Sequence, residues 1–239
     1  MSKQTQTYEG LVLKNINFKD SDKIYTIFIR VLGKVSAKAR GIRKFSSKRL
    51  SSLDSLNLVK VGLVGDHELK TITEVILIDS FKNVKQDFNK LKTAIYLIEI
   101  VSNYLNESSE YVELFDLLIK CLKRLEETSY SDSRIENFFE YQFLKMSGYE
   151  LNFYDCVFCK KTILESIKFN FNFEKGGIVC ENCSSSFNFF SNTQKNALFL
   201  LNNLKIQSEM DFVEVDKILK SYINSILPET PKSNRFFNR

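Results

Sequence analysis

Several residues and motifs on which enzymes and membrane proteins depend are missing or rare in this sequence. Histidine, the side chain that most often performs acid–base catalysis near neutral pH, occurs once among 239 residues, as His67. No Walker A motif, HExxH pair or glycine-rich dinucleotide motif occurs. No apolar run approaches the roughly 20 residues that span a bilayer, and residues 1–9 are polar without a signal-peptide core. We therefore expect a cytoplasmic protein that is neither an enzyme nor a membrane protein.

Proline and glycine, which interrupt helices and strands, are also few. The sequence has 2 prolines and 8 glycines, and 44% of its residues are hydrophobic while 26% are charged. This composition is typical of a globular protein, and a chain of this length buries a core without needing a metal or a disulfide to fold.

The positive charge is unevenly distributed along the chain. Residues 1–80 contain 14 Lys and Arg against 8 Asp and Glu, whereas the remaining residues contain 20 against 21. The net charge is therefore +6 in the first third and −1 in the rest. An excess confined to one region predicts an anionic partner there, either a nucleic acid or a membrane surface.

The first 80 residues have the pattern of a small β-barrel. β-Branched and aromatic residues recur in short segments separated by glycines. In the third segment Val35, Ala37 and Ala39 alternate with polar residues, as in a strand with one buried face. Five strands in about 75 residues are typical of the OB-fold. The predicted strands are 8–13, 24–31, 35–41, 56–64 and 71–78.

The hydrophobic period changes to that of helices after residue 80. We expect an α+β protein with an OB-fold DNA-binding domain at 1–80 and a helical domain at 81–239. Residues 151–190 break the helical pattern and form a separate insert. The predicted helices are 91–105, 111–125, 133–147, 193–204 and 212–226.

The insert contains the most specific motif in the chain. Four cysteines are spaced C-x2-C-x20-C-x2-C: Cys156, Cys159, Cys180 and Cys183. Two CxxC turns can each present two thiolates to one tetrahedral Zn²⁺. Ile167, Phe169, Phe171 and Phe173 alternate like a strand, and the Gly176-Gly177 pair can turn the chain back and bring the second CxxC beside the first.

Three interpretations of the four cysteines compete. A structural zinc site is favoured by the spacing and by the reducing compartment. A disulfide or redox pair is less favoured because neither CxxC lies in a thioredoxin-like βαβ context. A catalytic metal is disfavoured because four cysteines leave no open position for water. Cys121 stands apart, one helical turn from Leu118 and Leu125, and is expected to be a buried core thiol.

A stripe of basic residues runs through the predicted barrel without an acidic residue between positions 24 and 53. Lys34, Lys38 and Arg40 fall on one strand face, with Ser36 between them, and the remaining cations lie in a serine-rich loop. Flexible cations in a line, with hydroxyls between them, suit a phosphate backbone. The predicted DNA-binding residues are Arg30, Lys34, Lys38, Arg40, Arg43, Lys44, Lys48 and Arg49.

Other interpretations of the stripe remain open. One is a solvated face, and another is a polybasic membrane contact, which no amphipathic or lipidation signal accompanies. Phe28 and Phe45 lie beside the cations, and either stacks on a base or packs in the core.

These segments, taken in order, resemble the RecO family of recombination mediators over residues 7–190. In the barrel the resemblance lies in residues 10–13 (GLVL), 20–24 (DSDKI), Gly33-Lys34 and 39–44 (ARGIRK). In the helical body it lies in residues 96–99 (YLIE), Leu114-Phe115 and Leu117-Leu118. In the insert it lies in Gly148-Tyr149 ahead of Cys156 and in Gly176-Gly177 ahead of Cys180. Some family members lack the cysteines, so zinc belongs to a branch of the family.

The resemblance implies a protein of DNA repair and recombination after DNA damage, associated with the nucleoid. It implies binding of single- and double-stranded DNA and annealing of complementary strands. It also implies that a RecR-like partner helps the protein to load the RecA recombinase onto strands coated with single-strand DNA-binding protein. Two alternatives are an RNA-binding OB-fold and zinc protein of the translation apparatus, and a zinc-dependent hydrolase or NTPase.

Overall fold

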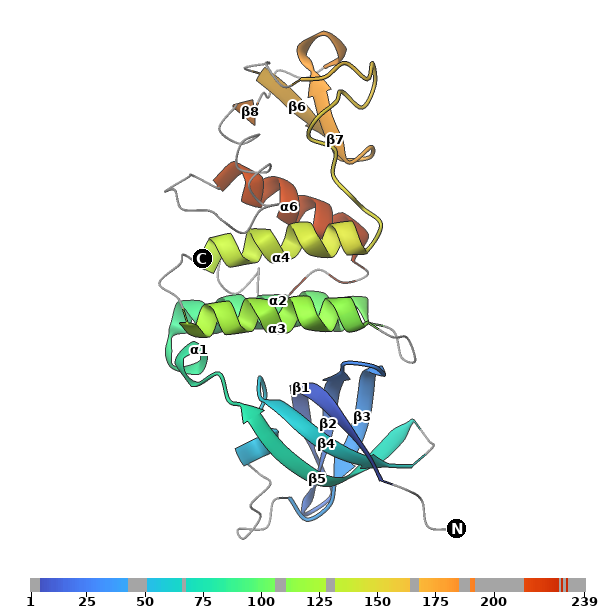
Figure 1. Cartoon of the computed structure of the whole chain (residues 1–239), viewed down its shortest axis with the longest axis vertical. Helices are drawn as coiled ribbons and strands as arrows, with labels where there is room; N and C mark the ends of the chain where they lie inside the picture. The colour runs from blue at the N-terminus through green and yellow to red at the C-terminus, as the bar shows by residue number, and fades with distance from the viewer. Residues whose placement is uncertain are drawn as a thin grey trace. The chain divides into compact units, whose positions relative to one another are not determined.

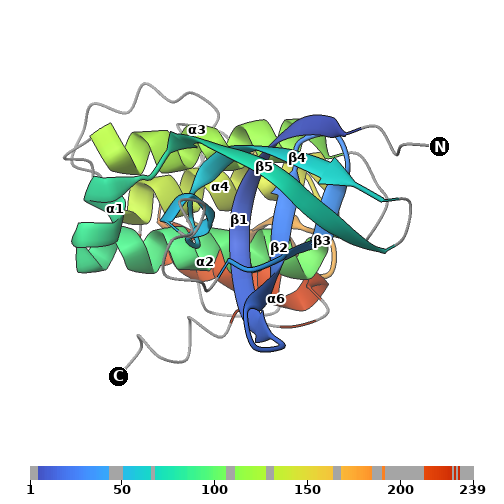
Figure 2. The same cartoon turned by 90° about the horizontal axis from the view of Figure 1, so that it is seen from below.

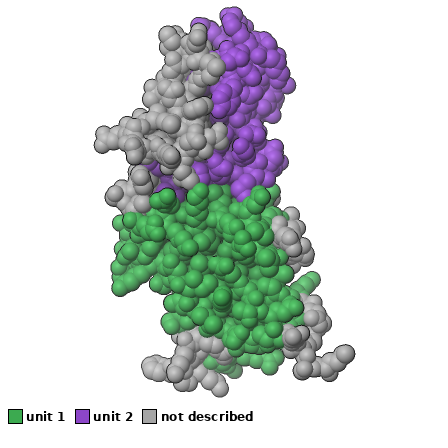
Figure 3. Space-filling view, in the orientation of Figure 1, with its two compact units in different colours: residues 1–128, 232–239 green, residues 129–231 purple. Residues whose placement is uncertain are grey.

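The computed structural model describes residues 5–42, 51–65, 68–105, 111–127, 132–163, 168–184, 190–191, 213–227, 229 and 231. The chain forms two compact units, which are drawn in different colours in Figure 3. The main part of the first unit is Met1–Thr128, and the second unit is Ser129–Pro231.

The first unit begins with a closed five-stranded barrel (Figure 1). Its strand order is β1-β2-β3-β5-β4, and all neighbours are antiparallel except the parallel pair β3 and β5. All five strands expected from the sequence are present, so the predicted OB-like barrel is confirmed. The strands are β1 (Gln6–Phe18), β2 (Asp22–Ile29), β3 (Gly33–Ala39), β4 (Leu58–Val64) and β5 (Leu69–Asp79), with a short 3-10 helix, η1 (Ser51–Leu53), between β3 and β4.

Alternation along the strands builds the core of the barrel. In β3, Val35, Ala37 and Ala39 are buried while Lys34, Ser36 and Lys38 are partly exposed, as the sequence predicts. The inward residues of the other strands are mainly Ile, Val and Leu, which fit a pleated and half-buried surface. The core is formed by Val12, Tyr25, Ile27, Ile29, Val35, Ala37, Ala39, Ile42, Leu53, Val59, Val61, Leu63 and Ile72.

Three helices complete the described part of the first unit: α1 (Lys82–Gln86), α2 (Phe88–Tyr104) and α3 (Val112–Glu127). The Asp87 carboxylate begins α2 by accepting hydrogen bonds from the N–H groups of Asn89 and Lys90. Figures 1 and 2 show α2 and α3 side by side across one end of the barrel. Phe28 of β2 packs edge-on against Phe115 of α3, with ring centres 5.2 Å apart. The barrel and these helices therefore share a core.

The second unit contains α4 (Asp132–Met146), β6 (Lys168–Asn172), β7 (Gly177–Cys180), η2 (Glu181–Cys183), β8 (Phe190–Ser191) and α6 (Val213–Ile226). The three strands form an antiparallel sheet in the order β7-β6-β8. The helices expected at 133–147 and 212–226 are thus present, whereas the one expected at 193–204 lies outside the described residues.

A charged cluster links α4 and α6. Lys220 of α6 lies 3.2 Å from Glu136 of α4 and 2.8 Å from Asp216 of its own helix. Burial lowers the pKa of Lys220, but the carboxylates of Glu136 and Asp216 outweigh that effect and raise it. The lysine therefore stays charged and helps hold α6 against α4.

Candidate metal centre and nucleic-acid interface

The first CxxC turn is closed by backbone hydrogen bonds. The N–H of Cys156 donates to the carbonyl of Lys161 (2.9 Å), and the N–H of Lys160 donates to the carbonyl of Cys156 (2.9 Å). Lys160 has φ 60°, so the chain reverses immediately after Cys159. This reversal places both thiols of the turn on the same side.

The second CxxC turn follows β7 directly. Cys180 is the last residue of the strand, and Cys183 ends the 3-10 helix η2. The N–H of Ser184 closes the turn by donating to the carbonyl of Cys180 at 3.1 Å. A tight helical turn suits a two-residue spacing because residues three apart are eclipsed on a 3-10 helix.

Gly176 and Gly177 allow the two turns to meet. Gly176 has φ 60°, and a Cβ on Gly177 would lie 2.7 Å from the carbonyl oxygen of Asn152. The backbone of the first turn pairs with β7, since the N–H of Val157 donates to the carbonyl of Ile178 at 3.0 Å. The sequence prediction of a glycine turn that brings the two CxxC segments together is therefore confirmed.

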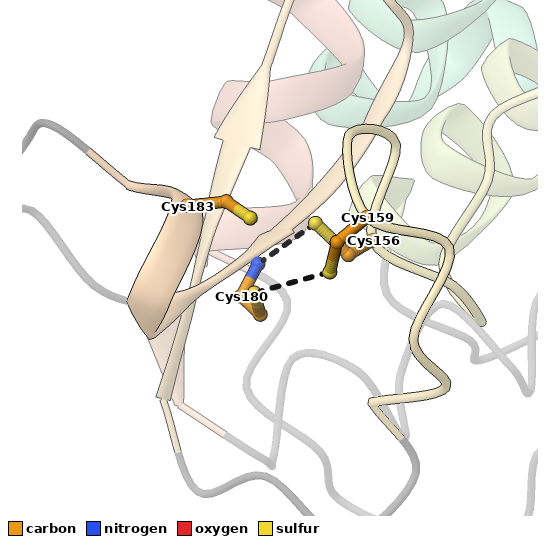
Figure 4. Close-up of side chains that lie close together, drawn as sticks. All are labelled: Cys156, Cys159, Cys180 and Cys183. Atoms are coloured by element: carbon orange, nitrogen blue, oxygen red, sulfur yellow. Dashed lines mark hydrogen bonds between the residues drawn. The ribbon is translucent and has the colours of Figure 1, made fainter.

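The four thiols converge on one point (Figure 4). All four Sγ atoms lie within 4.8 Å of one another, and those of Cys159 and Cys180 are 3.7 Å apart. Four sulfurs placed tetrahedrally at about 2.3 Å from a zinc ion stand about 3.8 Å apart. The cluster therefore has the donor set and spacing to hold one metal ion.

Backbone donors surround the most buried of these sulfurs. Burial opposes ionisation of Cys156, but the N–H groups of Cys159, Cys180 and Phe158 donate to its sulfur and bring its pKa down to about 6. One of these donors comes from the other CxxC turn: the N–H of Cys180 lies 3.4 Å from the sulfur of Cys156. A thiolate stabilised in this way is prepared to bind a metal cation.

The fifth cysteine is separate from the cluster, as predicted. Cys121 lies in α3 and is 2% exposed. Burial raises the pKa of Cys121 to about 12, so its thiol stays protonated at neutral pH.

The basic stripe divides between the two ends of β3. Lys34 lies at the end nearest the helices, where its Nζ donates to the carbonyl of Ser102 in α2 at 3.4 Å. Lys38 lies farther along the same outer face, and Arg40 is exposed just beyond the strand. Gly41, with φ 61°, then turns the chain, and its N–H donates to the carboxylate of Asp22 at 2.8 Å. That contact fixes the direction in which the chain leaves the barrel after Arg40.

Arg30 lies at the helical end of the barrel. Its Nε and Nη2 donate to the two carboxylate oxygens of Asp116 in α3, both at 2.8 Å. The hydrogen bonds from Arg30 hold the pKa of Asp116 below its ordinary value. Arg30 is thus engaged by a carboxylate in this structure, unlike Lys38 on the outer strand face.

The two phenylalanines considered for base stacking have different outcomes. Phe28 is 0% exposed because α3 covers this part of the outer barrel surface, so the stacking interpretation of Phe28 is wrong and the core interpretation is right. Phe45 lies outside the described residues, as do the predicted DNA-binding residues Arg43, Lys44, Lys48 and Arg49.

The structure adds an aromatic side chain that the sequence reasoning missed. Phe18 ends β1 and is partly exposed. The Nζ atoms of Lys19 and Lys38 lie 5.6 and 5.9 Å from the centre of its ring. Cations beside an exposed ring are a recurring arrangement in single-strand binding surfaces. The Phe18-Lys19 pair before the Asp20 turn was the available signal, but only the barrel brings it next to Lys38.

No helix in the described part of the chain has the length and apolar character required to cross a membrane.

Comparisons with known families match nearly the whole chain. The family described as "Recombination protein O N terminal" matches residues 1–81, and "Recombination protein O C terminal" matches residues 85–235. The junction between these two matches falls where β5 gives way to α1.

Individual relatives agree with these matches. The chain is 30% identical to a "DNA repair protein RecO" of Clostridium perfringens over 232 residues, which cover 94% of this chain and 94% of the relative. It is 30% identical to proteins of the same name from Syntrophus aciditrophicus (76% of this chain, 71% of the relative) and Streptococcus mutans (84% and 78%).

Proposed function

Because the chain belongs to the RecO family, we propose that it acts in DNA repair as a non-enzymatic recombination mediator. It binds single- and double-stranded DNA and anneals complementary strands. With a RecR-like partner, it helps load the RecA recombinase onto strands coated with single-strand DNA-binding protein. The observation that carries this proposal is a closed OB-like barrel with lysines beside the partly exposed ring of Phe18.

The proposed DNA surface follows from the geometry of β3 and its neighbours. OB-folds bind oligonucleotides on the face of strands 2 and 3 and on adjoining loops, including the loop between strands 1 and 2. Lys38 lies on that face, and Phe18 and Lys19 lie where β1 enters that loop. The lysines would contact phosphates, and Phe18 would stack on a base.

The remaining predicted cations follow this surface in sequence. Arg40 comes two residues after Lys38, and we propose that Arg43, Lys44, Lys48 and Arg49, which lie outside the described residues, also contact DNA. Arg30 and Lys34 would join only from the helical end, where Arg30 must exchange the carboxylate of Asp116 for a phosphate.

The proposed mechanism requires no bond to be made or broken. Cations that neutralise two strands at once lower the repulsion between them while their bases pair. Zn²⁺ bound by Cys156, Cys159, Cys180 and Cys183 would supply only structural cross-linking, because four cysteine ligands complete its coordination shell. We expect no turnover of ATP or DNA, and hydrolysis that co-purifies with the protein and is lost in a point variant would contradict this.

Salt-titrated binding tests the proposed surface. We expect the triple variant Lys38→Ala, Arg40→Ala, Arg43→Ala to bind mixed-sequence single-stranded DNA weakly and to lose annealing. Its slope of log K against log salt should fall by about 2, since each neutralised phosphate contributes about 0.7 on single strands. The matched control removes the same charge from exposed lysines elsewhere in the first unit, with Lys60→Ala, Lys82→Ala and Lys123→Ala. If the triple variant and this control give equal slopes, the barrel stripe is not the DNA site.

The alternative of an RNA-binding translation factor is separated by competition. Single-stranded DNA and RNA of the same sequence and length compete for the wild-type protein. Annealing is measured separately, on complementary oligonucleotides coated with single-strand DNA-binding protein. A strong preference for RNA together with no annealing would favour the alternative.

A further inference from the structure

The tip of the cysteine hairpin presents aromatic and basic side chains that lie outside the cluster of four thiols. Phe158, between the first two cysteines, is 50% exposed, and Phe173, in the turn between β6 and β7, is 43% exposed. Lys160, Lys161 and Lys175 are exposed beside them in sequence. Large aromatic side chains are normally enriched in the core, so two of them exposed on one small hairpin indicate a binding surface.

The backbone around the cysteines fixes the outward position of Phe158. The N–H of Phe158 donates to the sulfur of Cys156, which locks the turn in place. Of the two residues between Cys156 and Cys159, Val157 faces the hairpin, where its Cγ1 would lie 2.6 Å from a Cβ on Gly177. The Phe158 ring is therefore held in solvent on a rigid support, and immobilising it on a ligand costs little additional conformational entropy.

Basic side chains accompany the two rings. The Nζ of Lys175 lies 5.5 Å from the centre of the Phe158 ring, although the two residues come from different loops. Phe173 leans edge-on against the buried Phe171 with ring centres 5.1 Å apart. One surface thus combines an exposed ring with a lysine from the opposite loop.

The charges around the rings favour an anionic ligand over an apolar peptide. Residues 158–161 and 173–175, which form the tip, carry three exposed lysines and one exposed acid, Glu174, while Glu181 in the second CxxC turn is a further exposed acid on the hairpin. The carboxylate of Asp155 nearby accepts a hydrogen bond from the hydroxyl of Thr162 at 2.8 Å. A row of lysines beside an exposed ring matches a polynucleotide strand, which offers phosphates and the faces of unpaired bases together.

We propose that the hairpin tip is a second contact for single-stranded DNA, separate from the barrel. Phe158 stacks on an unpaired base, while Lys160, Lys161 and Lys175 contact the flanking phosphates. The inference rests on the proposed DNA binding but concerns other residues. Duplex DNA presents no unpaired base face, so the contribution of Phe158 is specific to single strands.

The test compares Phe158→Leu and Phe158→Ala with the wild-type protein at fixed salt. Loss of one stacked base weakens binding of single-stranded DNA by about fivefold at least and by about a hundredfold at most, which is the usual range for one base on an aromatic ring, and leaves duplex binding within about twofold. The matched control is Phe88→Leu, which changes another highly exposed phenylalanine, 69% exposed at the start of α2. Elemental analysis of every variant confirms that the bound metal is retained.

Cross-linking supplies a second readout that does not depend on affinity. A single strand carrying 5-iodouracil is irradiated with the wild-type protein, and cross-linked peptides are identified by mass spectrometry. We expect a cross-link at Phe158 and none at Phe88. The double variant Lys160→Ala, Lys161→Ala should reduce the salt slope by about 1.4 on single strands.

The outcomes separate this inference from the proposed function. If the barrel triple variant loses binding while Phe158→Leu binds single strands like wild type and no cross-link forms at Phe158, only the hairpin contact is overturned. Equal losses on single and double strands would also overturn it, because stacking requires unpaired bases. An equal loss on single-stranded RNA supports the same stacking chemistry. If the wild-type protein binds no single strand, the proposed function and this inference both fall.

Discussion

The barrel and the cysteine hairpin both present lysines beside aromatic rings, but different forces hold them in place. The barrel closes its sheet on itself around a core of Ile, Val, Leu and Ala side chains. The hairpin has only five residues in β6 and four in β7, and its thiols converge within 4.8 Å. A sheet this small, whose third strand β8 has two residues, is at best marginally stable alone, whereas each buried aliphatic side chain contributes about 1.5–3 kcal/mol. The hairpin also buries side chains such as Phe169 and Ile178, but these are few, so it is expected to need a metal in addition, whereas the barrel depends on burial alone.

The largest expected effect is the loss of stability when one of the four clustered cysteines is replaced, and it should be confined to the hairpin. Cys156→Ser removes the most buried of the four thiols, and metal binding is folding free energy for such sites, about 10–16 kcal/mol for structural zinc. We expect the bound metal to be lost and the amides of β6 and β7 to lose protection from hydrogen exchange, while those of β1 to β4 keep theirs. Stability should fall more than DNA binding does.

Cys121→Ala is the matched control for that experiment, because Cys121 is buried in α3 away from the cluster. It should retain the metal and cost the first unit about 1 kcal/mol. Wild-type protein that contains no metal when purified without chelator would contradict the metal-dependent hairpin, as would unchanged protection of β6 and β7 in Cys156→Ser.

A second prediction tests whether the barrel depends on burial, by removing a buried side chain and leaving the cysteines unchanged. Phe28→Ala removes a fully buried ring that packs on Phe115, and such changes cost about 3–5 kcal/mol. We expect a lower denaturant midpoint for the first unit and an unchanged metal content. Phe28→Leu keeps most of the apolar volume and should cost much less. If Phe28→Ala instead weakened single-strand binding without any loss of stability, the assignment of Phe28 to the core would be wrong.

A third prediction concerns the point where the two cysteine turns meet. Gly177→Ala would place a Cβ 2.6 Å from Cγ1 of Val157 and 2.7 Å from the carbonyl oxygen of Asn152, and that backbone atom cannot move cheaply. We expect a loss of about 1–3 kcal/mol in the second unit and faster loss of metal to a chelator.

The control for Gly177 is Gly148→Ala, which lies in the same unit. Gly148 has φ +82°, and nothing lies within 4 Å of its built Cβ, so alanine there brings backbone strain without a clash. We expect the Gly148→Ala variant to lose bound metal to a chelator at the wild-type rate. Equal chelator kinetics for the two alanine variants would show that close approach at Gly177 is not required.

The smallest expected effect comes from the ion pair between the barrel and α3. Asp116→Asn removes the partner of Arg30, but the Asp116 side chain is 52% exposed, so the loss of stability should be about 0.5–1 kcal/mol. Arg30 lowers the pKa of Asp116 in the folded protein. The contribution is therefore present above the ordinary aspartate pKa of about 3.9 and disappears as the pH falls through the lowered folded-state value.

A double-mutant cycle between Asp116→Asn and Arg30→Gln, measured by denaturant unfolding at neutral and acidic pH, isolates this term. The coupling should be present at neutral pH and vanish in acid. Coupling that persists at a pH well below the folded-state pKa of Asp116 would mean that the pair is not held by charge.

Much of the fold could be predicted because its signals are local. Short segments of β-branched and aromatic residues identified all five barrel strands, and alternation in β3 assigned each of its side chains to the correct face. The spacing of the four cysteines identified the residues whose thiols converge, because a CxxC turn brings its two thiols together by itself. Gly176 and Gly177 signalled the connecting turn for the same reason.

What the sequence could not provide depends on contacts between distant segments. The sequence left Phe28 open between base stacking and core packing because its strand face also carries Thr26 and Arg30, and only the packing of α3 on that face decides for the core. Arg30 and Asp116 are 86 positions apart, so their ion pair has no local signature. Phe18 comes beside Lys38 only when the strands of the barrel are in register.

The sequence by itself determined the barrel, the family and the cluster of four cysteines, since strand patterns and cysteine spacing act over a few residues. The tertiary structure alone decided which basic and aromatic side chains share a surface. In the folded chain Phe28 is buried in the core and Arg30 pairs with Asp116. The ring of Phe18 lies beside Lys38, and the ring of Phe158 lies beside Lys175. The physical reason is that burial and charge pairing depend on which chain segments pack together, and periodicity in one segment carries no information about its partner.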